Sequence, residues 1–239
     1  MTGMLASVTD DLECEMAITA GVDIIDLKDP ANGALGALPP HRISSIVSQL
    51  AGRRPVSATL GDLPADPVLL RREIQRCAGS GVDYVKIGVF SFEHIDACLE
   101  AAVHSSRNVA LIAVFFADRD PPLHTLPEFS AVGFTGVMLD TAYKLGGGLL
   151  ENLDSRRIQQ FIDQARNLGL LCGLAGSLKL QDIPQLLPLA PDYLGFRGAL
   201  CRGRQRRQRL DPANLEAVRR QVSCSTTGCG KSGKSGEAH

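Results

Sequence analysis

The sequence predicts an α/β protein built as a single (β/α)8 barrel. Short apolar strand patterns alternate with helical patterns along the chain, which implies parallel strands joined by helical crossovers. Eight such units in roughly 220 residues match the usual size of a closed barrel. An open doubly wound sheet is the alternative, but no G-x-G-x-x-G turn follows the first strand.

The first half of the chain supplies four of the expected units. Its apolar, β-branched runs predict strands at 5–8, 24–30, 55–60 and 84–89, and the intervening patterns predict helices at 10–21, 43–50, 68–78 and 92–105. An acidic start favours the first helix. We expect Gly21, Gly52, Gly79 and Gly169 at the positions that follow helix ends, where a left-handed backbone favours glycine.

The second half completes the series. It predicts strands at 109–116, 136–140, 171–175 and 193–198, helices at 126–132, 154–169 and 212–222, and a further helix after Ser177. The run 109–116 is almost wholly apolar, which is typical of a strand covered on both faces. One catalytic domain is therefore expected over 1–222.

Residues 223–239 form a tail of different character. They are rich in Ser, Gly and Thr without apolar periodicity, which predicts disorder. Within them, 228–235 match the phosphate-loop expression G-x-x-x-x-G-K-[ST]. That loop works between a strand and a following helix, whereas here a helix precedes it and four residues follow, so we interpret the match as chance.

Composition limits the classes of function. The hydrophobic content is 44% and the formal net charge is -1, which is typical of a soluble globular protein and gives no argument for nucleic acid or a membrane as partner. Seven cysteines without a C-x-x-C motif, and no signal peptide, favour reduced thiols and a cytoplasmic location. The five histidines are scattered, so no metal site is expected.

Charged residues at or near strand ends are the main functional signal. Asp26 and Lys28 lie two apart and therefore point to the same side of a strand, Lys86 lies in the fourth strand, and Asp140 ends the sixth with Lys144 just beyond. Barrel active sites lie at the carboxyl ends of the strands. A buried lysine among other cations can lose its proton and attack a carbonyl, which gives a Schiff base. Plain ion pairs of Asp26 with Lys28 and of Asp140 with Lys144 are the alternative.

A phosphate site is the second inference. Gly176 and Ser177 follow the seventh strand, and Arg197 and Gly198 follow the eighth, where barrels often bind phosphate. Glycine allows close backbone approach, Ser177 can cap the following helix, and Arg197 offers a fork of donors. Tight turns alone are the alternative explanation for these glycines.

Further polar candidates are less specific. Strand ends also carry Ser57, Thr59 and Asp118, and an arginine run follows the eighth strand at Arg202, Arg204, Arg206, Arg207 and Arg209. This run fits a second phosphate or nucleic acid, but a solvated approach to the last helix is the more usual meaning of such a run.

Taken together, the motifs resemble the (5-formylfuran-3-yl)methyl phosphate synthase family. The resemblance rests on 24–36, 56–62, 83–88, 139–144, 174–178 and 196–199, which span nearly all of the chain before the tail. It implies a TIM barrel that condenses two molecules of glyceraldehyde 3-phosphate to a formylfuran phosphate for methanofuran-type cofactors, with loss of phosphate and water. It also implies that Lys28 forms the Schiff base with help from Lys86, Asp140 and Lys144, and that no cofactor is needed. The arginine run and the tail depart from the family pattern, and we expect neither to touch the chemistry.

Other functions stay open at this point. A general class I aldolase or a phosphosugar isomerase would use the same lysine and phosphate loops. A nucleotide-binding protein would depend on the tail, and a barrel that senses a phosphorylated metabolite would bind without covalent trapping. The expected partners are a phosphorylated triose and, since barrels often associate through their helices, further copies of the chain.

Overall fold

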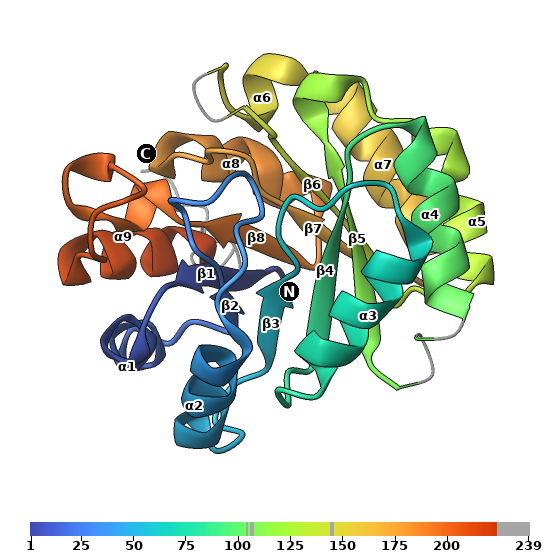
Figure 1. Ribbon diagram of the computed structural model, residues 1–239. Helices are drawn as coiled ribbons and strands as arrows, with labels where there is room; N and C mark the ends of the chain where they lie inside the picture. The colour runs from blue at the N-terminus through green and yellow to red at the C-terminus, as the bar shows by residue number, and fades with distance from the viewer. Residues whose placement is uncertain (104, 106–107, 144–145, 224–239) are drawn as a thin grey trace, which may run out of the picture.

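The computed structural model describes residues 1–103, 105, 108–143 and 146–223. Eight parallel strands close into a barrel in the order β1-β2-β3-β4-β5-β6-β7-β8, and helices surround it (Figure 1). The barrel prediction is confirmed. The strands are β1 (Gly3–Val8), β2 (Ile24–Leu27), β3 (Val56–Thr59), β4 (Tyr84–Val89), β5 (Ala110–Phe116), β6 (Gly136–Asp140), β7 (Leu171–Leu174) and β8 (Tyr193–Phe196).

The helices follow the strands in sequence and pack outside them. They are α1 (Asp11–Thr19), α2 (Pro40–Leu50), α3 (Pro67–Ala78), α4 (Phe92–Val103), α5 (Leu126–Ala131), α6 (Leu149–Asn152), α7 (Ser155–Asn167), α8 (Ile183–Leu186) and α9 (Pro212–Ser223). Asp10, Asp66 and Asp154 cap α1, α3 and α7, each by accepting a backbone N–H of the first turn. The predicted tail lies outside the described residues except Ser223, which ends α9.

One local expectation was wrong. Gly79 follows α3 with φ of -61°, and the left-handed glycine lies later, at Gly81 with φ of 85°. The further helix expected after Ser177 is present as the four-residue α8, flanked by short 3-10 turns. Pro184 and Pro188 occupy first-turn positions there, and each removes the backbone donor that a continuous helix would need.

The barrel has two apolar cores. The larger one lies between the strands and the helices and includes Phe115, Phe129 and Phe161. The smaller one fills the barrel interior and includes Leu5, Ile112, Val114, Met138 and Tyr193. Because side chains alternate along a strand, the inward positions of β2, β4 and β6 place Asp26, Lys86 and Asp140 beyond this inner core.

Aspartates at the amino ends of three strands serve the fold. Asp23, Asp83 and Asp192 immediately precede β2, β4 and β8, and each accepts the backbone N–H of a residue at the start of the preceding strand at 2.7 Å. The repeated contact fixes strand register at the end of the barrel that in this fold serves stability. Chemistry is therefore expected at the opposite end.

Candidate active site

A cavity of about 800 Å³ opens at the carboxyl ends of the strands. Asp26, Lys28, Lys86 and Asp140 line it together, although they come from three different strands or strand ends. β2 ends at Leu27, so Lys28 is the first residue after it. The structure thus brings four of the five expected catalytic residues into one cavity, and the fifth, Lys144, lies outside the described residues.

Lys86 and Asp26 form an ion pair deep in this cavity. Lys86 Nζ lies 2.5 Å from Asp26 Oδ1, and both side chains are buried. The hydroxyls of Ser7 and Ser57 also donate to the Asp26 carboxylate, each at 2.7 Å. These contacts follow the strand register, in which Ser7 lies opposite Asp26 and Asp26 opposite Ser57. Asp26 is therefore held from both neighbouring strands.

The surroundings keep Asp26 ionised. Burial by itself would raise the pKa of this carboxyl group, but the charges of Lys86 and Lys28 and hydrogen bonds from Lys86 and Ser57 outweigh it and hold the pKa below its ordinary value. A buried carboxylate of this kind stabilises a nearby ammonium group. We conclude that Asp26 fixes the position of Lys86.

Lys28 lies beside Asp140, a carboxylate from a different strand. Its Nζ lies 3.5 Å from Asp140 Oδ2, whereas Asp26 pairs with Lys86. Asp140 Oδ1 accepts the backbone N–H of Thr141 at 2.7 Å, which orients the carboxylate. Lys28 is 7% exposed, so a small molecule in the cavity can reach its amino group. These two ion pairs thus join side chains from different strands.

Ser57 and Thr59 are buried and serve these strand ends. Ser57 donates to Asp26, and the Thr59 hydroxyl donates to the carbonyl of Gly36 at 3.0 Å. Neither Ser57 nor Thr59 is among the described residues that line the cavity. Their direct contact with substrate stays a prediction, while the hydrogen bonds show them holding Asp26 and the segment after β2.

The loop after β7 presents backbone donors to the cavity. Gly176 and Ser177 line it with φ of 102° and 51°, and their N–H groups donate to no residue in the described part of the chain. A Cβ at Gly176 would lie 3.2 Å from the backbone N of Thr141, so glycine is needed there. The expected helix cap by Ser177 was wrong: the next helical turn is Leu180–Asp182, its N-cap residue is Lys179, and the N–H of Lys179 donates to Asp182.

Arg197 follows β8 and lines the cavity, but its guanidinium group is occupied by protein. It forms an ion pair with the buried Glu13 at 2.5 Å and also donates to the carbonyls of Ser7, Arg206 and Gln208. Gly198 lines the cavity beside it and begins a short 3-10 turn. Arg197 is therefore bound to the frame of the site, and phosphate binding by its side chain stays a prediction.

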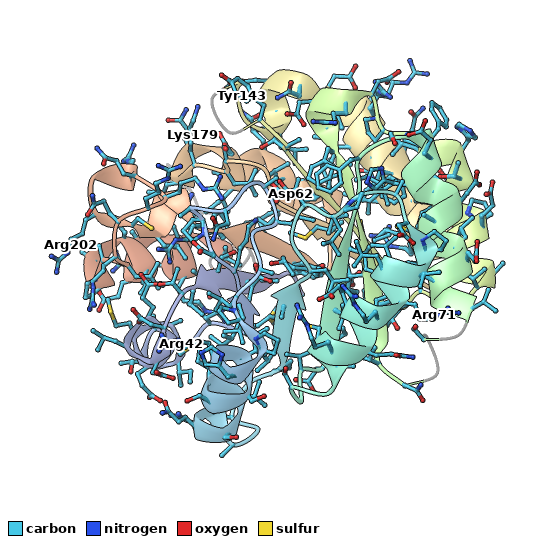
Figure 2. All side chains as sticks on the ribbon, in the orientation of Figure 1. Arg42, Asp62, Arg71, Tyr143, Lys179 and Arg202 are labelled. Atoms are coloured by element: carbon cyan, nitrogen blue, oxygen red, sulfur yellow. The ribbon has the colours of Figure 1, made fainter. Side chains whose placement is uncertain are left out.

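The segment after β2 covers part of the barrel opening, and Figure 1 shows it in blue, arching above the strand ends. Asp62, near the centre of the view in Figure 2, accepts the N–H groups of Ala34 and Leu35 at 3.0 and 2.9 Å. Leu35 is 1% exposed and belongs to the inner apolar core. It fills the opening on one side, and the cavity remains toward β1, β7 and β8.

Sequence reasoning missed three polar residues of the site. Ser7 orients Asp26, Glu13 holds Arg197, and Asp62 fixes the segment after β2. Ser7 had a signal, since it is a polar residue in an apolar strand. Glu13 had none, because a first-turn glutamate normally faces solvent, whereas here it is 1% exposed.

The arginine run lies closer to the site than expected. Arg204, Arg206 and Arg207 line the cavity, and Arg206 donates to the carbonyl of Gly33 at 3.2 Å. The segment folds back over the strand ends instead of extending toward α9. That the run does not touch the chemistry stays a prediction.

Within the described ranges, the chain has neither a metal-binding cluster nor a membrane-spanning helix. No group of three or more His, Cys, Asp or Glu side chains stands close enough to bind a metal ion. Within the same ranges, no helix combines the length and the apolar character needed to cross a membrane.

Comparison with known proteins identifies the family. The family model described as 4-HFC-P synthase matches residues 4–219. The chain belongs to this family. A relative from Methylorubrum extorquens, provisionally named a (5-formylfuran-3-yl)methyl phosphate synthase, is 43% identical over 213 residues, which are 89% of this chain and 88% of the relative. The synthases of that name from Methanosarcina mazei and Methanocaldococcus jannaschii are each 34% identical and cover 84% and 85% of this chain and 91% and 92% of their own.

Solved structures support the fold alone. Phosphoribosyl anthranilate isomerase from Thermus thermophilus aligns with a TM-score of 0.67 at 15% identity and covers 94% of this chain and 100% of its own. 3-Hexulose-6-phosphate synthase from Salmonella typhimurium gives 0.64 at 14% identity, with 92% and 98% covered. This member of the 4-HFC-P synthase family therefore shares their barrel fold. Because the identity is so low, the comparison says nothing about its substrate.

Proposed function

We propose that this protein is a (5-formylfuran-3-yl)methyl phosphate synthase that condenses two molecules of glyceraldehyde 3-phosphate through a Schiff base on Lys28, for the biosynthesis of a methanofuran-type cofactor. One observation carries the proposal. The amino group of Lys28 faces a cavity at the carboxyl ends of the strands, 3.5 Å from Asp140, in a member of the family with that name. Its homo-oligomeric state and cytoplasmic location stay predictions.

The two ion pairs suit imine chemistry. The neutral amine is the nucleophile, so Lys28 must give up a proton, and Asp140 is close enough to accept it. Lys86 keeps its charge through Asp26, and a fixed ammonium group nearby favours the neutral form of Lys28. Water leaves as the amine and the carbonyl of the first triose form the imine.

The later steps follow from the imine. Loss of the proton on the adjacent carbon, with Asp140 or Lys144 as base, gives an enamine whose carbon attacks the aldehyde of the second triose. Elimination of one phosphate, ring closure through a hydroxyl oxygen and dehydration then give the furan, and hydrolysis frees Lys28. Two triose phosphates thus yield one furan phosphate, one phosphate and two water molecules. Aromaticity of the furan draws the sequence forward.

Borohydride trapping tests the proposal. The protein is incubated with glyceraldehyde 3-phosphate, with and without borohydride, and read by intact mass, peptide mapping and ultraviolet absorbance. A reduced adduct on Lys28 and a new furan aldehyde absorbance are expected. Lys28→Ala should lose both, whereas Asp163→Asn, which breaks an exposed ion pair with Arg166 outside the cavity, should keep the adduct.

The outcomes separate the alternatives. An adduct on Lys28 without the absorbance would leave a Schiff-base aldolase and reject the furan synthase. Absence of any adduct and of any turnover would reject the lysine mechanism. Furan formation that survives in Lys28→Ala would move the nucleophile to another residue.

A further inference from the structure

The loop between β8 and α9, residues 202–209, is closed by backbone hydrogen bonds and places arginines along the cavity. We call it the arginine loop. The buried residues Cys201 and Leu210 close its base as an antiparallel bridge, and Arg202 N–H donates to the carbonyl of Arg209 at 3.0 Å. Further backbone hydrogen bonds, from Arg204 to Cys201 and from Gln208 to Gln205, fold it upon itself.

Arg197 holds this loop in place from below. Its Nε and Nη2 donate to the carbonyls of Arg206 and Gln208, both at 2.9 Å, while Glu13 fixes the other side of the guanidinium group. Glu13 also accepts the N–H of Leu210 at 3.1 Å, so one buried carboxylate supports both the base of the loop and its brace. The position of Arg206 is thus set by buried contacts.

The charges around the cavity do not balance. The described residues that line it include seven basic and two acidic side chains. Four of the basic residues have carboxylate partners: Lys28, Lys86, Lys179 and Arg197. In contrast, Arg204, Arg206 and Arg207 form no ion pair with any described residue.

Arg206 is the arginine of the loop that turns inward. It alone among residues 202–209 is partly buried, and its Nη2 donates to the carbonyl of Gly33 in the segment after β2. Burial lowers the pKa of Arg206, the Asp140 and Asp62 charges oppose that effect, and the neighbouring Arg207 and Arg197 add to it. Arg202, by contrast, points outward at the far left of Figure 2.

We propose that Arg206, with Arg204 and Arg207 beside it, forms a second phosphate-binding subsite, distinct from the backbone donors after β7, and that Arg197 is its positioning residue. Arg206 uses one of its donors on the carbonyl of Gly33, which leaves others for a phosphate monoester, a group that arginine binds in a bidentate manner. Assignment of this subsite to the second triose phosphate rests on the proposed function. The anion site itself does not.

Titration with glycerol 3-phosphate tests the subsite, because this compound has no carbonyl group and cannot react with Lys28. Calorimetry and phosphorus NMR should show two bound anions on the wild-type protein. Arg206→Gln keeps a donor for the Gly33 carbonyl but removes the charge, and it should weaken one of the two sites by roughly tenfold or more. Arg202→Gln removes the same charge from the exposed part of the loop and should bind as the wild type does.

The two proposals fail separately. Two unchanged sites in Arg206→Gln would overturn the subsite, and so would a single anion bound to the wild type. Arg206→Lys keeps the charge, so it should restore part of the anion affinity that Arg206→Gln loses. No restoration at all would also count against a charge-based site. If the wild type makes no furan while Arg206→Gln still loses an anion, the proposed function is rejected and the subsite stands.

Discussion

Replacement of Asp26 by asparagine should destabilise the protein strongly, because it leaves the ammonium group of Lys86 buried without a counter-charge. Both partners of the pair are almost wholly buried, with exposed side-chain fractions of 3% for Lys86 and 1% for Asp26. Removing one partner of a buried ion pair costs about 3–5 kcal/mol. The whole free energy of unfolding of a domain is about 5–15 kcal/mol, so Asp26→Asn should remove a large part of it.

Urea unfolding at neutral pH measures the effect, with Lys86→Met and the double variant completing a cycle. We expect the double variant to be more stable than the sum of the single losses predicts, because it buries no isolated charge. Asp163→Asn is the matched control: it breaks an ion pair with Arg166 in which both side chains are more than half exposed, and it should cost less than about 1 kcal/mol. Losses below about 1 kcal/mol for both single variants in the buried pair would refute the reasoning.

The pH dependence of the same variant has a defined sign. The pKa of Asp26 is lower in the folded protein than its ordinary value of 3.8, so the folded state favours the ionised form. This stabilisation is complete above the unfolded pKa and is lost as the pH falls through the folded pKa. The difference in stability between wild type and Asp26→Asn should therefore narrow below about pH 4. A difference that widens on acidification would show that Asp26 is protonated in the folded state.

Three further predictions concern the frame around the site. Asp83→Asn removes the carboxylate that accepts the N–H of Val56, and it should lower the free energy of unfolding in urea by about 1–2 kcal/mol. Borohydride trapping should be unchanged, because Asp83 lies at the end of the barrel opposite the cavity. A folded variant that loses trapping would contradict this separation of stability from chemistry. Gly173→Ala places a Cβ 2.2 Å from the ring of Tyr193, so it should overpack the barrel interior and destabilise the protein by about 1–3 kcal/mol. The measurement is a lower midpoint of thermal unfolding. An unchanged midpoint would show that the ring can move. Burial raises the pKa of Cys98 to about 12, so this thiol should resist alkylation in the native protein near pH 8. Peptide mapping should find Cys98 unlabelled until the protein is unfolded. Prompt labelling in the native protein would show local opening.

The barrel could be predicted from the sequence because its signals are local and repeated. Each strand is a short apolar run, and each following helix begins or ends at a residue with a defined physical role, such as the aspartate caps of α1, α3 and α7. Gly79 shows the limit of such signals. Either Gly79 or Gly81 can end the helix, and only the contacts of the turn decide that Gly81 takes the left-handed backbone.

The residues of the cavity were predictable by type and place, but their partners were not. Asp26 and Lys28 do point to the same side, as their spacing requires. Yet the strand register lets Asp26 reach Lys86 on β4, while Lys28 lies next to Asp140 from β6. Distances between strands depend on the tilt and stagger of the closed barrel, and no local pattern encodes them.

Arg197 shows why a motif position does not fix a role. Its place after β8 predicts a phosphate ligand, whereas the structure shows its guanidinium group bound to the buried Glu13 and to the carbonyl of Arg206, nine positions later. The ion pair with Glu13 joins residues 184 positions apart, which sequence reading has no means to detect. A change in the length of the loop after Cys201 would move Arg206 without altering the motif at 196–199.

The depth of each charge in the cavity gives the arrangement a chemical sense. At the bottom, Lys86 lies beside Asp26 and Lys28 lies beside Asp140, and all four side chains are buried. At the opening, Arg204 and Arg207 are exposed and Arg206 is partly buried. A uniformly positive cavity would attract phosphate to its bottom as well. In the reaction proposed above, we expect this separation to hold the phosphate groups at the rim and to leave the carbonyl carbon to Lys28.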